Sequence, residues 1–228
     1  MYWLRRLFAR STPQTLPSID AYARWAAAYP AHAHNALMRA EEAALVGLLP
    51  PLDGRTVLDL ACGSGRYAQI AQARGAAQVI ALDNSPHMLA QVALRLRGLA
   101  TMDALPLATS SVDVIVCGLA IGHVQAITPV LAACARVLTP DGVLLISDVH
   151  PLLFIGGARR TFSSGGATFA VEHYVHLYSD MHAAARTAGL IIDAIAEPRL
   201  LPEDRQPGAP STPVAIVYRL RHSTLAAR

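Results

Sequence analysis

The chain has 228 residues, of which 53% are hydrophobic and 15% are charged, so a single domain with a sizeable core is expected rather than disorder. No apolar run approaches the roughly 20 residues of a membrane helix, and the basic N-terminus lacks the apolar segment of a secretory signal. All 19 basic residues are arginine, which excludes a P-loop lysine, a Schiff-base lysine and a Ser-Lys dyad.

The charge and the cysteines narrow the class of protein further. The net charge of +3 is small and most arginines are scattered along the chain, so no nucleic-acid partner is expected. The three cysteines, Cys62, Cys117 and Cys134, lie in apolar surroundings without CxxC spacing. They are expected to be buried, reduced thiols in a cytoplasmic protein.

The N-terminal part is expected to be a loose arm of about 15 residues followed by two helices. Residues 20–49 are rich in alanine and carry apolar residues at helical spacing, with one break near Tyr29 and Pro30.

From Thr56 onward, β-branched segments alternate with helical ones, which is typical of βαβ units and a parallel sheet. A turn at residues 139–142 should close the last of these helices. The expected strands are Thr56–Leu60, Gln78–Leu82, Leu99–Met102, Val112–Cys117 and Val143–Asp148, and the expected helices are Arg66–Arg74, Pro86–Arg97 and Ala126–Leu138.

The alternation stops after Pro151. Residues 152–176 are rich in glycine, serine and aromatic residues, and such an insertion would lie at the carboxyl end of a strand, where open α/β sheets bind ligands. A helix near 180–188 and strands near 190–197 and 214–220 should complete the chain. We therefore expect a doubly wound α/β fold with a seven-stranded, mostly parallel sheet, its last strand antiparallel, and an N-terminal helical cap.

The most informative segment is residues 57–68, VLDLACGSGRYA, where a strand runs into glycines and then into a helix. Gly63, Gly65 and Ala68 complete the GxGxxA form of a dinucleotide fingerprint, so an NAD-binding site stays open. Asp59 favours another ligand, because a carboxylate there would not help to bind a pyrophosphate but would help to bind a cation.

With this segment, four further blocks resemble the class I S-adenosylmethionine-dependent methyltransferases, in particular the small-molecule branch that includes the ubiquinone-biosynthesis and malonyl-carrier-protein methyltransferases. The blocks are ALDNS at 81–85, DALPL at 103–107, SVDVI at 111–115 and RVLTPDGVL at 136–144. The resemblance implies a Rossmann-like methyltransferase fold, with S-adenosyl-L-methionine as cofactor. It further implies one methyltransferase domain over 1–228, divided into a helical cap (1–50), a cofactor-binding core (51–149), an acceptor-site insertion (150–180) and the C-terminal part of the sheet (181–228).

The resemblance also implies roles for the residues at the strand ends. Asp83 would accept both ribose hydroxyls, and Asp103 would accept from the adenine amino group. The alternative for both is a turn or capping residue at a strand end. Tyr22 and Tyr29 could form a lid over the sulfonium or pack on the sheet. The expected cofactor-binding residues are Tyr22, Tyr29, Arg39, Asp59, Ala61, Gly63, Gly65, Asp83, Asn84, Met88, Met102, Asp103, Ala104 and Leu119.

The resemblance says less about the residues that would bind or activate the methyl acceptor. His150 is the first candidate for a general base and His123 the second, while a carboxylate acceptor would instead use Arg159 or Arg160 as a clamp. The expected substrate-binding residues are Arg159, Arg160, His173, Tyr174 and His176, and no metal site is expected.

The expected activity is O-methylation of a small molecule by a cytoplasmic monomer or homodimer without a membrane partner. Carboxyl or N-methylation, an NAD-dependent oxidoreductase and a non-catalytic nucleotide-binding protein remain alternatives.

Overall fold

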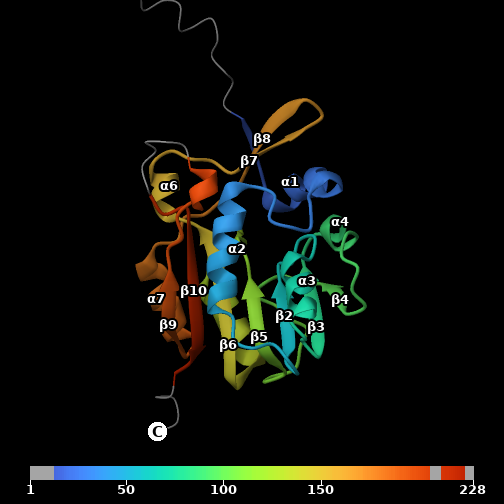
Figure 1. Ribbon diagram of the computed structural model, residues 1–228, viewed down its shortest axis with the longest axis vertical. Coiled ribbons are helices and arrows are strands. Elements are labelled where there is room, and N and C mark those ends of the chain that lie inside the picture. Colours follow the sequence, from blue (N-terminus) through green and yellow to red (C-terminus); the bar gives the residue numbers. More distant parts are fainter. Residues whose placement is uncertain (1–12, 206–211, 224–228) are drawn as a thin grey trace, which may run out of the picture.

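A computed structural model describes residues 13–205 and 212–223 and contains a seven-stranded sheet (Figure 1). The strand order is β4-β3-β2-β5-β6-β10-β9, and every pairing is parallel except those that β10 makes with β6 and β9. The predicted doubly wound, mostly parallel fold is therefore confirmed. The strands are β2 (Thr56–Leu60), β3 (Gln78–Asp83), β4 (Arg97–Leu99), β5 (Val112–Cys117), β6 (Leu138–Val149), β9 (Leu190–Ala196) and β10 (Ala215–His222).

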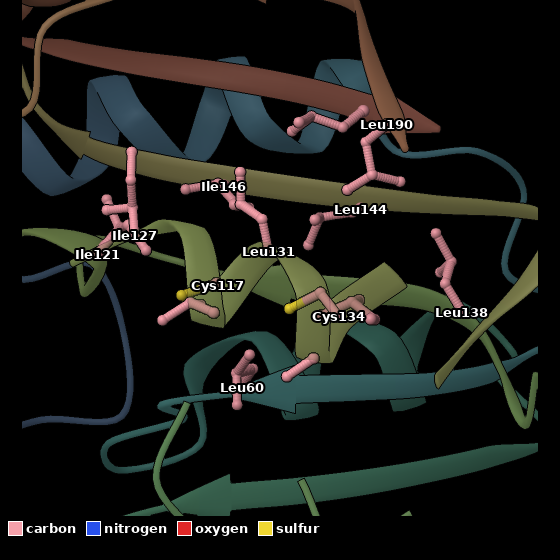
Figure 2. Packing of buried hydrophobic residues seen from close by; sticks show 14 of the residues in the cluster. Leu60, Cys117, Ile121, Ile127, Leu131, Cys134, Leu138, Leu144, Ile146 and Leu190 are labelled. Atoms are coloured by element: carbon pink, nitrogen blue, oxygen red, sulfur yellow. The ribbon is translucent and has the colours of Figure 1, made fainter. Parts of the chain in front are cut away.

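Helices cover both faces of this sheet. Because successive side chains of a strand point to opposite faces, each central strand packs against helices on both sides. In β2, Val57 packs with α2 (Ala36–Leu48) and α3 (Arg66–Ala73), whereas Leu58 packs with α5 (Thr128–Val137) and α7 (Tyr178–Thr187). Figure 2 shows Leu131 of α5 pointing toward Leu144 and Ile146 of β6, in the cluster that also includes Cys134. The largest hydrophobic cluster among the described residues lies on this face.

A small second sheet lies above the carboxyl ends of the parallel strands (Figure 1). β7 (Thr161–Ser164) and β8 (Ala167–Val171) form a hairpin, and β1 (Gln14–Leu16) pairs with β8 in parallel. These strands pack against α1 (Ser18–Trp25). We refer to α1, β1, β7 and β8 together as the cover. The cover thus combines the β7–β8 hairpin of the predicted insertion with β1 and α1 of the N-terminal region.

Of the two N-terminal helices, α1 belongs to the cover, whereas α2 packs its buried Leu45 against the sheet. Residues 1–12, most of the predicted arm, lie outside the described residues.

The largest error in the predicted elements lies between β3 and β4. Only α4 (Pro86–Leu89) is helical there, and β4 begins at Arg97 instead of Leu99. The Arg97 guanidinium donates to the carbonyl oxygens of Val92 (2.6 Å) and Leu94 (3.0 Å), which stabilises an irregular chain in place of a helix.

The predicted turn at 139–142 falls within β6, where the register with β5 shifts. The short α6 (Pro151–Ile155) follows β6. None of the described helices is both long and apolar enough to cross a membrane.

Candidate active site

A cavity of about 390 Å³ opens between the carboxyl ends of the central strands and the cover. Its walls come from the loops after β2, β3, β4 and β5, from α1, and from Arg160 next to β7. This is the edge at which open α/β sheets bind ligands. The predicted residues that line it are Tyr22, Tyr29, Asp59, Ala61, Gly63, Asp83, Asn84, Met88, Met102, Asp103, Leu119, His123 and Arg160.

The loop after β2 owes its shape to backbone angles that glycine adopts easily. Gly63 has φ +55° and Gly65, which precedes α3, has φ +87°. Gly63 lines the cavity, whereas a side chain on Gly65 would meet Val92 at 3.4 Å. Gly65 therefore sets the backbone path of the loop on its Val92 side and does not form the cavity wall.

Two buried carboxylates lie under this loop. Asp59 accepts a hydrogen bond from the Ala68 backbone N–H (2.8 Å), and Asp83 accepts from the N–H groups of Gly63 and Ser85, both at 2.8 Å. Burial raises the pKa of Asp59 to about 7 and raises that of Asp83 as well.

No described arginine or histidine lies within 4 Å of either the Asp59 or the Asp83 carboxylate. A bound cation or hydroxyl group would therefore find two acceptors without a charged partner.

Arg160, His123 and Tyr22 meet on the other side of the cavity. Arg160 Nη1 donates to the Leu119 carbonyl oxygen (2.7 Å) and lies 3.2 Å from His123 Nε2, which also lies 3.1 Å from the Tyr22 hydroxyl. His123 Nδ1 faces the Glu172 carbonyl oxygen at 3.2 Å. Because a carbonyl only accepts, Nδ1 carries the proton and Nε2 accepts from its two neighbours.

The electrostatics of this cluster keep His123 uncharged. Burial, followed by the nearby Arg160 charge, lowers the pKa of His123 to about 3. Burial also raises the pKa of Tyr22 above its ordinary value, so its hydroxyl stays protonated. Arg160 is thus the charged member of the cluster.

The sequence did not reveal the role of Glu41, a fully buried carboxylate in α2. It accepts from Arg66 Nη2 (2.9 Å), from the Tyr67 hydroxyl (2.6 Å) and from the Ser147 hydroxyl, which in turn accepts from the Leu119 N–H (3.0 Å). An acid on the apolar face of a predicted helix was the available signal. The network connects α2 to the cavity wall and neutralises Arg66.

The first general-base candidate, His150, does not line the cavity. It lies before α6, where Nδ1 is 3.3 Å from the Leu152 N–H, and its Nε2 is 3.1 Å from Glu197 Oε1. The structure therefore gives His150 a capping position, and the second candidate, His123, is the histidine at the cavity.

His173 lies behind the cavity wall. It stacks on Phe154, with ring centroids 3.9 Å apart, and its Nε2 is 3.6 Å from Asp148.

The remaining predicted residues also lie outside the cavity wall. Arg39 forms an ion pair with Asp204, the Ala104 N–H donates to the Thr101 carbonyl oxygen (3.2 Å), and His176 Nε2 is 2.8 Å from the Val124 carbonyl oxygen. The side chain of Arg159 is exposed. Predicted residues that do not line the cavity are Arg39, Gly65, Ala104, His150, Arg159, His173, Tyr174 and His176. Among the described residues, no group of three acidic, histidine or cysteine side chains could hold a metal ion.

Known proteins resemble this chain in sequence and in fold. A family model described as a methyltransferase domain matches residues 58–146. The chain is 31% identical over 172 residues to a ubiquinone biosynthesis O-methyltransferase of Xylella fastidiosa, covering 67% of each chain. A malonyl-[acyl-carrier protein] O-methyltransferase of Enterobacter lignolyticus is 32% identical over 120 residues, 51% of this chain and 47% of that protein.

A solved S-adenosylmethionine-dependent methyltransferase from Mesorhizobium loti has the same fold, with a TM-score of 0.68 and 22% identity over 80% of this chain and 98% of that one. For several other curated relatives the chain spans about half of their length.

These findings define a class I methyltransferase fold with a ligand cavity at the carboxyl edge of its sheet. The chain belongs to the S-adenosylmethionine-dependent methyltransferases, and S-adenosylmethionine is the cofactor of the family. The residues present fit this molecule, because the carboxylates of Asp59 and Asp83 suit a ligand that combines cationic groups with ribose hydroxyls.

Proposed function

We propose that the protein transfers the methyl group of S-adenosylmethionine to an oxygen atom of a small-molecule acceptor. The observation that carries the proposal is the division of charge in the cavity. Asp59, Asp83 and Asp103 line one side, and Arg160 lines the other beside the uncharged His123. Arg66 also lines the cavity, but it is paired with Glu41 and Glu42. Acids suit the cationic cofactor, whereas an arginine repels a protonated amine and attracts an oxygen that carries negative charge. This division favours O-methylation over N-methylation.

The cofactor, when bound, supplies an electrophilic methyl group on a sulfonium. On the proposed arrangement Asp83 accepts the ribose hydroxyls, Asp103 accepts from the adenine amino group, and Met88 and Met102 provide polarizable contacts to the adenine. Asp59 contributes negative potential near the cationic end.

The cover encloses the cavity in the proposed reaction. Tyr22 of α1, with the nearby Tyr29, lines the cavity from the cover side and reduces the access of water. Holding both reactants in one enclosed site is the main contribution that such an enzyme can make, because good alignment lowers a barrier by about 7–11 kcal/mol in favourable cases.

The proposal is tested in two steps. Calorimetry should show binding of S-adenosylmethionine and S-adenosylhomocysteine in preference to NAD, which separates a methyltransferase from an oxidoreductase. The protein is then incubated with S-adenosylmethionine carrying a labelled methyl group and with matched phenols, carboxylic acids and amines. Label in an oxygen-linked product supports the proposal. Transfer only to amines contradicts O-methylation, and binding of the cofactor without any transfer supports a non-catalytic protein.

A further inference from the structure

We infer that the acceptor is a carboxylic acid whose carboxylate is bound by Arg160 and receives the methyl group as an ester. The inference rests on the proposed function and adds the chemical class of the acceptor to it.

The first argument is the charge of Arg160. The hydrogen bonds of its Nη1 go to the Leu119 carbonyl and to His123 Nε2, and Tyr29 lies within reach of the guanidinium. All three partners are uncharged, and no described carboxylate lies within 4 Å of this guanidinium. The buried Asp148 carboxylate acts on Arg160 only from beyond 4 Å, so this partly buried cation has no anion in direct contact, which is unfavourable. An anionic ligand would supply the missing charge.

The second argument is position, because S-adenosylmethionine also carries a carboxylate. The cavity acids belong to one half of the sheet, with Asp59 in β2, Asp83 at the end of β3 and Asp103 after β4. Arg160 instead contacts Leu119, which follows β5 and is held by hydrogen bonds from its N–H to Ser147 of β6. Arg160 therefore lies on the side of the cavity away from the acids, where the second reactant would bind.

The third argument is that His123, the histidine beside Arg160, is not available as a general base. The Nε2 lone pair of His123 already faces two donors, the Tyr22 hydroxyl and Arg160, and Nδ1 donates to a carbonyl. A phenol or alcohol would need a proton acceptor there. A carboxylic acid has an ordinary pKa near 4 and is already ionised at neutral pH.

The methyl transfer itself balances without a proton. A carboxylate oxygen forms the new C–O bond as the S–C bond breaks, and the electron pair of that bond remains on the sulfur, which becomes a neutral thioether. The anionic acid becomes a neutral ester. Because the ester no longer pairs with the guanidinium, the same residue that binds the substrate favours release of the product.

The test compares Arg160→Gln with Arg159→Gln, a neighbouring arginine whose exposed side chain lies outside the cavity wall. The probes are benzoate, phenylacetate and octanoate, each beside its amide, and phenol. Calorimetry on protein saturated with S-adenosylhomocysteine should show that an acid binds more tightly than its amide. Arg160→Gln should reduce that acid's affinity by about 10- to 150-fold, as expected for a hydrogen bond between charged groups. Arg159→Gln should leave it within threefold.

Two further measurements identify the bound carboxylate and the product. Arg160→Gln should keep its affinity for S-adenosylhomocysteine, which also shows that the variant is folded. A parallel loss for S-adenosylhomocysteine but not for 5′-methylthioadenosine, which lacks the amino-acid part, would assign Arg160 to the cofactor and overturn the inference. Transferred label should be released as methanol by mild alkali, because methyl esters hydrolyse there and methyl ethers do not.

The inference fails if no acid binds at least tenfold more tightly than its amide, or if phenol is methylated and the acids are not. In the second case O-methylation stands while the acid acceptor is wrong. If the protein does not bind S-adenosylhomocysteine, the proposed function itself fails.

Discussion

Replacing Asp83 with alanine removes a carboxylate that serves both the loop after β2 and the cofactor. In the free protein its oxygens accept from the N–H groups of Gly63 and Ser85, and Asp83 is only 7% exposed. A buried donor left without a partner destabilises by about 1–3 kcal/mol, and cavity water can replace part of each bond. We expect the free energy of unfolding to fall by about 2–4 kcal/mol, which lowers the melting temperature by roughly 4–16 °C in a domain of this size.

The same substitution should weaken S-adenosylhomocysteine binding by about 2–4 kcal/mol, or roughly 30- to 1,000-fold, because two charge-assisted bonds to the ribose are lost. Asp83→Asn keeps the shape and one acceptor oxygen, and should lie between the wild type and Asp83→Ala in both measurements.

Calorimetry with an analogue that lacks the ribose 2′-hydroxyl separates the two effects. The analogue should lose less affinity than S-adenosylhomocysteine when Asp83 is replaced. Unchanged affinity of Asp83→Ala for S-adenosylhomocysteine would refute the ribose assignment. Equal losses for both ligands would show that Asp83 acts only through the loop.

The other predictions concern pH, stability and loop geometry. Burial raises the pKa of Asp59 to about 7 in the free protein, and a bound cation should lower it. Affinity for S-adenosylmethionine should therefore rise as the pH increases to about 7 and level off above it. Calorimetry across this pH range should show a smaller rise for Asp59→Asn. Identical pH profiles for the two proteins would contradict this role of Asp59. Glu41→Gln leaves the buried Arg66 paired only with Glu42, at 3.1 Å, so urea unfolding should show a loss of about 1.5–3 kcal/mol. A loss below 1 kcal/mol would show that the network contributes little. Gly65→Ala forces a side chain to adopt φ +87° against Val92, and its thermal unfolding should reveal a loss of about 1–2 kcal/mol, whereas an unchanged melting temperature would show that the loop relaxes.

Local spacing was enough to predict β2, β3 and the loop after β2, but not the segment between β3 and β4. Residues 57–68 combine an alternating strand, two glycines and a helix start, and each of these depends on near neighbours in the chain. The parallel order then places Asp59 and Asp83 at the same edge, because β2 and β3 pair directly. The sequence could therefore indicate both the fold and the region of the cavity.

The acceptor side depends on contacts between distant segments, which spacing does not reveal. β1 pairs with β8, so Leu16 aligns with Val171, and the hydrogen bond from Tyr22 to His123 joins residues 101 positions apart. His150 has the same residue type as His123 and a similar place after a strand, but Glu197 lies near its ring. Only the tertiary structure distinguishes the two histidines.

The cover has a hydrophobic cluster of its own, formed by Leu16, Ala21, Phe162 and Val171 and separate from the clusters that hold the sheet. Free energies of substitution add when the sites share no partners. Changes within this small cluster should therefore alter the cover side of the cavity, and their free energies should simply sum with those of changes under α5 or α2, without coupling. Selection can then act on the two halves of the site separately, so that the acceptor can change over evolution while the cofactor is kept.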